Sequence, residues 1–161
     1  MARGQVDYLQ DQFEESDPVE DESDLRGSSP SELSDAVVQG TDWTTATLLD
    51  QIERGRIQLN PNFQRRDAWT RERKSKFIES LMLGFPIPQI VLAESKGQRG
   101  KFIVIDGKQR LLSLIQFAGS EENLSSFERL RLTKLEILDQ FNGLTLEELQ
   151  SDNSAVYLDE W

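Results

Sequence analysis

Five polar or small residues, Asp106-Gly107-Lys108-Gln109-Arg110, follow an unbroken apolar run of β type and precede leucines at helical spacing. The pattern predicts a strand, a turn at Gly107 and a helix whose first turn carries Lys108 and Arg110. Free N–H groups and the helix dipole already make that end positive. Two cations placed there indicate a bound anion, and a phosphate group would fit.

A purely structural interpretation accounts for part of this stretch. Asp106 stands where a helix cap is expected and Gln109 follows three residues later, which is the spacing of a capping box. It leaves Lys108 and Arg110 unexplained. Side chains tilt toward the N-terminus of a helix, so both cations can reach an anion there. The alternative is that Asp106 and outside carboxylates such as Asp67 neutralise them.

A second stretch, PNFQRRDAW at 61–69, combines arginines with aromatic residues ahead of a predicted helix. Arg65 and Arg66 lie beside Gln64, between Phe63 and Trp69. Arginine forks suit phosphate, and an aromatic face suits a base. The alternative is that the two aromatic residues are core anchors and the arginines lie on the surface. We expect the basic run RERKSK, 71–76, to be a solvated helix face.

The elements that must position these residues follow from periodicity and from Gly and Pro. Residues 126–138 fit neither the helical nor the strand period, whereas the other segments fit one of them. The expected elements are a helix from Thr44 or Thr45 to Gly55, a strand at 56–60, a helix from about Thr70 to Gly84, an extended crossing at 85–88, strands at 89–94 and 101–106 joined by a hairpin loop, and a short helix at 144–150.

Composition excludes several kinds of site within this chain of 161 residues. It contains no cysteine and no histidine, which rules out the usual zinc sites, Ser-His-Asp triads and nucleases built on a histidine base. The apolar runs are too short to span a bilayer, and the first residues lack the apolar core of a signal peptide. We therefore expect a soluble cytoplasmic protein with no membrane partner.

The charge is distributed unevenly. Residues 1–40 carry eleven acidic and two basic residues, and they hold few large apolar side chains. We expect them to form an acidic, disordered N-terminal tail. Between 54 and 110 there are thirteen basic and five acidic residues, a local net charge of +8. This basic middle can meet a polyanion despite the formal charge of −11 of the whole chain, although a solvated surface of mixed charge is the alternative.

The order and spacing of LNPNFQRRDAW, GFPIPQIVLAE and FIVIDGKQRLLSL resemble the N-terminal domain of GmrSD-type, type IV restriction proteins. The resemblance covers about 42–161. It implies a ParB-like and sulfiredoxin-like α/β (α+β) fold, a small mixed sheet flanked by helices. It also implies a domain at 41–161 that is truncated at its C-terminal end.

The resemblance further implies binding and hydrolysis of a nucleoside triphosphate with Mg²⁺, coupled to recognition of modified phage DNA and to a nuclease partner or domain elsewhere. The matching residues include Asp106, which would place the metal or a water, and Arg110. The full set is Gln64, Arg65, Trp69, Asp106, Gly107, Gln109 and Arg110, with Lys108 beside them; Asp106, Gln109 and Arg110 are the catalytic candidates.

One departure from the family pattern bears on activity. The motif usually reads DGQQR, and this chain has Lys108 at the first glutamine. A lysine strengthens phosphate binding, whereas loss of a water-orienting glutamine would impair hydrolysis. The resemblance thus implies an NTPase-type regulatory domain of an anti-phage restriction protein. A non-catalytic DNA-binding module and a ParB-like nuclease domain are the alternatives.

Overall fold

The computed structural model describes residues 43–58, 68–95, 97–124 and 127–151, all within the larger unit of the chain, Ala36–Trp161. The predicted acidic tail and the C-terminal end therefore lie outside the described residues. No helix in the described part is long and apolar enough to cross a membrane. The elements are α3 (Thr45–Glu53), β1 (Ile57–Gln58), α5 (Arg71–Met82), β2 (Val91–Glu94), β3 (Phe102–Asp106), α6 (Lys108–Ala118), α7 (Glu121–Leu124), the 3-10 helix η2 (Asp139–Phe141) and α8 (Leu146–Ser151).

Two of the helices begin at threonine caps, as the sequence predicts. The hydroxyl groups of Thr44 and Thr70 accept hydrogen bonds from backbone N–H groups three residues on, at 3.2 and 3.3 Å, and satisfy donors that the first turn leaves free. Gly55 and Gly84 lie just beyond the C-termini with φ of 63° and 67°. A left-handed residue at this position ends a helix, and glycine adopts it without strain.

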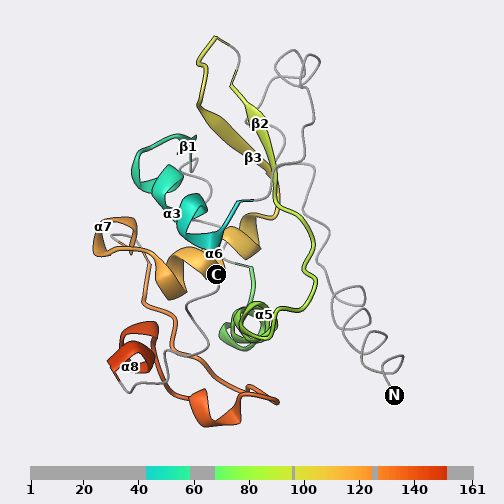
Figure 1. Ribbon diagram of the computed structural model, residues 1–161, viewed down its shortest axis with the longest axis vertical. Coiled ribbons are helices and arrows are strands. Elements are labelled where there is room, and N and C mark those ends of the chain that lie inside the picture. The colour runs from blue at the N-terminus through green and yellow to red at the C-terminus, as the bar shows by residue number, and fades with distance from the viewer. Residues whose placement is uncertain (1–42, 59–67, 96, 125–126, 152–161) are drawn as a thin grey trace. The chain divides into compact units, whose positions relative to one another are not determined.

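The sheet is small and mixed, which confirms the predicted fold class. Its order is β1-β3-β2, with β1 parallel and β2 antiparallel to the central strand β3. The register pairs Ile57 with Phe102 across β1–β3, and Leu92 with Val104 across β2–β3. The β2–β3 hairpin and α8 lie at opposite ends of the described unit (Figure 1). The hairpin loop at 95–100 was predicted correctly.

Helix α6 is the centre of the core. All eight residues from Arg110 to Phe117 are buried, so the helix is covered on every side rather than along one stripe. It packs against α5, α3 and α7. Phe77 and Ile78 of α5 and Leu111 and Ile115 of α6 have no exposed surface. The strand end that precedes α6 is therefore fixed to a rigid helix.

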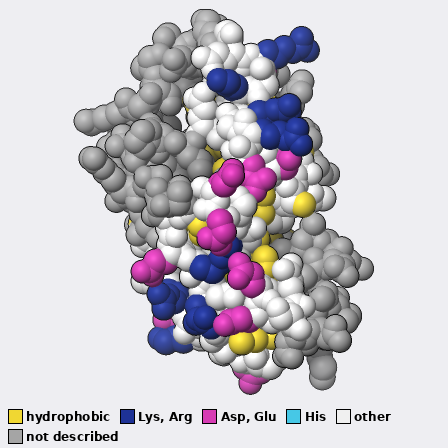
Figure 2. Space-filling model, turned by 90° about the vertical axis from the view of Figure 1, so that its left-hand side faces the viewer, with side chains coloured by type: hydrophobic (Ala, Val, Ile, Leu, Met, Phe, Trp, Pro, Cys, Tyr) yellow, Lys and Arg dark blue, Asp and Glu magenta, His cyan; other side chains and the backbone are white. Residues whose placement is uncertain are grey.

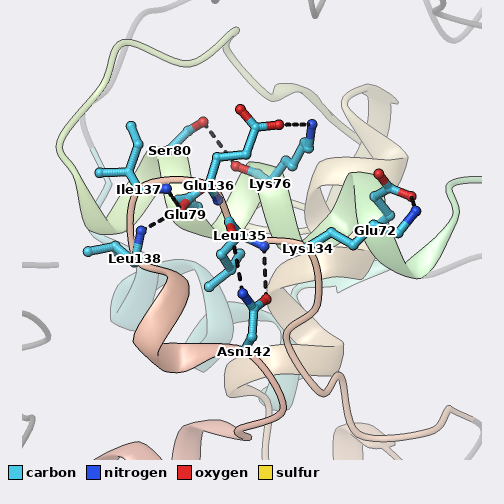
Figure 3. Close-up of polar contacts among 10 residues, drawn as sticks. All are labelled: Glu72, Lys76, Glu79, Ser80, Lys134, Leu135, Glu136, Ile137, Leu138 and Asn142. Atoms are coloured by element: carbon cyan, nitrogen blue, oxygen red, sulfur yellow. Dashed lines mark hydrogen bonds and ion pairs between the residues drawn. The ribbon is translucent and has the colours of Figure 1, made fainter.

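The leucine segment, residues 127–138, has little regular secondary structure, which explains why its sequence fits neither period. Its fixed points are side chains of α5. The hydroxyl of Ser75 accepts a hydrogen bond from Thr133 N at 3.1 Å. The Glu79 carboxylate accepts from Ile137 N and Leu138 N, both at 2.8 Å, as Figure 3 shows. Glu79 is only 6% exposed. Side chains of α5 therefore supply the acceptors that these buried backbone N–H groups would otherwise find in a strand or helix.

Further polar contacts tie the same segment at its edge. Asn142 accepts from Leu135 N at 2.9 Å and donates to Leu135 O at 3.3 Å. Lys76 of α5 pairs with Glu136 at 2.7 Å (Figure 3). The segment that carries the buried leucines is thus held by hydrogen bonds from α5, which precedes it in the chain, and from Asn142, which follows it.

Candidate functional site

The turn between β3 and α6 differs from the predicted capping box. Asp106 remains in the sheet, paired with Val91 of β2. Gly107 occupies the cap position with φ 89° and ψ 23°, and no side chain caps the helix. Gln109 is consequently the second residue of the helix, one position too early to close a capping box. The capping-box prediction is wrong because the strand extends one residue further than the spacing indicates.

Gln109 instead joins the two sequence motifs. Its side-chain oxygen Oε1 accepts hydrogen bonds from Ala68 N and Trp69 N, each at 3.2 Å. These two N–H groups end the PNFQRRDAW stretch, forty residues earlier in the chain. The first motif is therefore attached directly to the first turn of α6. Gln64 and Arg65, the other residues predicted from that motif, lie outside the described residues.

Arg110 folds back over the start of its own helix. Its Nη2 donates to Asp106 Oδ2 at 2.8 Å and to the backbone oxygen of Gln89 at 3.2 Å. The residue is only 9% exposed. The interpretation that Asp106 neutralises a cation of the motif therefore holds for Arg110. Lys108, in the same first turn, is half-buried.

One polar group of Arg110 lacks a partner. Its Nε is buried and has no hydrogen-bond partner. A buried donor without an acceptor costs about 1 to 3 kcal/mol, so a nearby acceptor would relieve a real penalty. The guanidinium lies against Gly107, because a Cβ there would come within 3.1 Å of both Nε and Nη2, and within 3.0 Å of Ile90. The free donor thus lies beside the positive end of α6.

Gly107 is required at this position for two reasons. Its φ of 89° is in the left-handed region that side chains rarely adopt, and the space that a side chain would need is occupied by Arg110 and Ile90. The turn therefore combines a positive helix end with a buried guanidinium packed against the backbone.

Trp69 lies in the core rather than on an open surface. It is buried, makes an edge-to-face contact with Phe77 at 5.9 Å between ring centroids, and is covered by Arg73 at 4.7 Å. This supports the core-anchor interpretation. The expectation that 71–76 is a solvated face is wrong for Lys74 and Ser75. Both are buried. Lys74 faces α6, where its Nζ donates to Gln116 Oε1 at 2.9 Å, and Ser75 faces the leucine segment, where its hydroxyl accepts a hydrogen bond from Thr133 N.

The acidic residues near the turn are few. Among the described residues, no three His, Cys, Asp or Glu side chains lie close enough together to hold a metal. Asp106, with a side chain 49% exposed, is the carboxylate of the motif. Mg²⁺ is commonly held by one or two carboxylates together with substrate phosphates, so a single aspartate fits a metal that arrives with a nucleotide.

Sequence reasoning missed the contribution of Gln89 and Ile90. Both lie within the strand predicted at 89–94, but β2 begins only at Val91. The backbone oxygen of Gln89 accepts a hydrogen bond from Arg110, and the Ile90 side chain lies beside Gly107. A signal was available, since a hairpin between β2 and β3 must place the beginning of β2 beside the end of β3. The residues just before β2 therefore had to lie at the turn.

Comparison with known proteins adds the family. Searches of curated proteins and of solved structures found no match. A family model, described as GmrSD restriction endonuclease, N-terminal domain, matches residues 45–160. The match includes both motifs, the whole sheet and every described helix. The chain therefore belongs to the GmrSD restriction endonuclease N-terminal domain family.

Proposed function

We propose that this chain is a regulatory domain that binds a nucleoside triphosphate, with Mg²⁺, within an anti-phage restriction protein that acts on modified DNA. The phosphates would bind at the N-terminus of α6. The observation that carries the proposal is the buried, unpartnered Nε of Arg110 beside Gly107. An anion there would accept from Arg110 and from backbone N–H groups of the first turn.

Each residue of the turn has a separate part in this proposal. Arg110 and Lys108 bind phosphate. Asp106 orients Arg110 and supplies a carboxylate ligand for the metal. Gly107 leaves room for the Arg110 guanidinium to lie against the backbone. Gln109 positions the first motif against the turn through Ala68 and Trp69. Bound Mg²⁺ would neutralise phosphate charge, while the chain itself binds and orients the nucleotide.

Titration calorimetry with each of the four common ribonucleoside triphosphates and Mg²⁺ tests the binding step. Arg110→Ala should weaken binding about ten- to hundredfold, because a charge-assisted hydrogen bond contributes about 1.5 to 3 kcal/mol. Arg71→Ala is the control, since Arg71 is exposed and lies only 3.6 Å from Glu128 as an ion pair. Equal affinity in Arg110→Ala and the parent would overturn the proposed site.

Phosphoanhydride hydrolysis is a separate step and needs its own assay. Lys108→Gln restores the usual DGQQR motif. If the glutamine orients the attacking water, phosphate release should be faster in this variant than in the parent, at equal or weaker nucleotide affinity. An unchanged rate of phosphate release in a variant that still binds nucleotide would show that residue 108 takes no part in hydrolysis.

A further inference from the structure

The β2–β3 hairpin ends in a tight, well-bonded tip. Ser95 N donates to Lys101 O at 2.7 Å, and Lys101 N donates to Gln98 O at 3.0 Å. Gly97 and Gly100 have φ of 75° and 78°, which closes the turn without strain. These bonds hold the described backbone of the tip against the sheet. The hairpin extends to one end of the described unit in Figure 1.

Three exposed cations gather at this end. Arg99 and Lys101 belong to the hairpin, and Arg56 precedes the neighbouring strand β1. Phe102 N donates to Arg56 O at 2.7 Å, and the register then places Arg56 beside Lys101 on adjacent strands. Adjacent strands are about 4.8 Å apart, so the backbones that carry Arg56 and Lys101 are neighbours. Figure 2 shows Lys and Arg side chains gathered at the corresponding upper end of one face.

These cations differ from most other basic residues of the described part in how they are paired. Within the described part of the chain, none of the three contacts a carboxylate; Arg56 donates to the amide oxygen of Gln51 at 3.3 Å. Glu94, the nearest acid of the hairpin, accepts a bond from Gly100 N at 2.6 Å. Elsewhere basic side chains form ion pairs, for example Arg54–Asp50, Lys76–Glu136, Arg131–Glu148 and Lys134–Glu72.

We propose that this basic tip, formed by Arg56, Arg99 and Lys101, binds the phosphate backbone of duplex DNA. Clustered cations without carboxylate partners repel one another, and a polyanion relieves that repulsion while releasing its own counterions. A two-stranded ribbon also fits the major groove, which is about 12 Å wide. The family match to a restriction endonuclease domain makes DNA the relevant polyanion. Backbone contacts position a protein but read no sequence.

The test measures binding of a fluorescent 30-base-pair duplex to the whole chain by anisotropy, across a series of salt concentrations. The test variant combines Arg56→Gln, Arg99→Gln and Lys101→Gln. The control combines Arg71→Gln, Lys76→Gln and Lys134→Gln, which change the net charge equally but remove cations already paired with Glu128, Glu136 and Glu72. Circular dichroism checks that both variants fold.

We expect the tip variant to bind at least about tenfold more weakly, with the slope of log K against log salt reduced by about 3, one for each phosphate contact. The control should bind within about twofold of the parent. Equal loss in both variants, or no duplex binding by the parent, would overturn the proposal. Nucleotide affinity, measured on the same samples, should be unchanged in the tip variant, so failure here is distinct from failure of the nucleotide site.

Discussion

Two buried polar residues, Glu79 and Arg110, occupy similar surroundings but differ in how far their hydrogen bonds are satisfied. Glu79 is 6% exposed and bonds two backbone N–H groups at 2.8 Å and a third, that of Glu136, at 3.4 Å. Arg110 is 9% exposed and leaves Nε without a partner. A buried carboxylate with its hydrogen bonds made is explained by the fold, whereas a buried donor without a partner needs a further explanation, which an anion at the turn would supply.

The largest effect should come from removing the saturated carboxylate. Glu79→Ala leaves the N–H groups of Ile137 and Leu138 buried without an acceptor, so we expect the free energy of unfolding to fall by about 3 kcal/mol. Urea denaturation would measure it. Glu72→Ala, which breaks the exposed pair with Lys134, is the matched control and should cost less than about 1 kcal/mol. A similar loss of stability in both variants would mean that the buried Glu79 carboxylate contributes no more than an exposed ion pair.

Arg110→Ala should cost less stability than Glu79→Ala although both side chains are buried. It removes the bonds to Asp106 and to Gln89 O, but it also removes an unsatisfied donor. We expect a loss of about 1 to 2 kcal/mol in urea unfolding. The same variant should lose nucleotide affinity, whereas Glu79→Gln, which keeps an acceptor oxygen, should retain it. A larger stability loss in Arg110→Ala than in Glu79→Ala would reverse the comparison.

A smaller effect is expected at Gln109, whose oxygen serves two N–H groups near the surface. Gln109→Ala should speed hydrogen exchange of the Ala68 and Trp69 amides and lower stability by about 1 kcal/mol. Gln109→Glu keeps an acceptor and should preserve the slow exchange. Amide exchange followed by NMR separates these outcomes. Unchanged exchange in Gln109→Ala would mean that the side chain does not attach the first motif to α6.

The smallest effect concerns the start of α8. Thr145 N donates to Glu148 Oε2 at 2.8 Å, and this backbone hydrogen bond, helped by Arg131, holds the pKa of Glu148 below its usual value. Because the folded pKa is the lower one, the stabilisation is present above the ordinary glutamate pKa of about 4.3 and is lost as the pH falls. Glu148→Gln should slightly flatten the acid side of the stability profile, measured by thermal melts. An identical acid limb in both proteins would contradict this.

The sequence predicted the elements better than the details of the turn. Thr44, Thr70, Gly55 and Gly84 marked helix ends correctly because caps and left-handed glycines act locally. The leucine segment could not be assigned, since its conformation depends on Glu79 and other side chains of a distant helix. Local patterns carry no information about such partners.

The turn between β3 and α6 also depended on a distant partner that its local sequence does not reveal. The spacing of Asp106 and Gln109 suggested a capping box, but pairing with β2 keeps Asp106 in the strand. A reciprocal pair of this kind occurs instead between Thr145 and Glu148, where no strand competes. The cations of the motif were identified from residue type alone. That Arg110 would bond Gln89 O depended on the sheet register, which a single motif does not specify.

The hydrogen bonds from Ala68 and Trp69 to Gln109 close a loop in the path of the chain. Everything between these points, including α5 and the hairpin, departs from one junction and returns to it. Insertions or deletions at the hairpin tip would therefore change how far it reaches without displacing the junction. The reach of the hairpin and the geometry of the turn that carries Asp106 and Arg110 are thus set by separate parts of the chain.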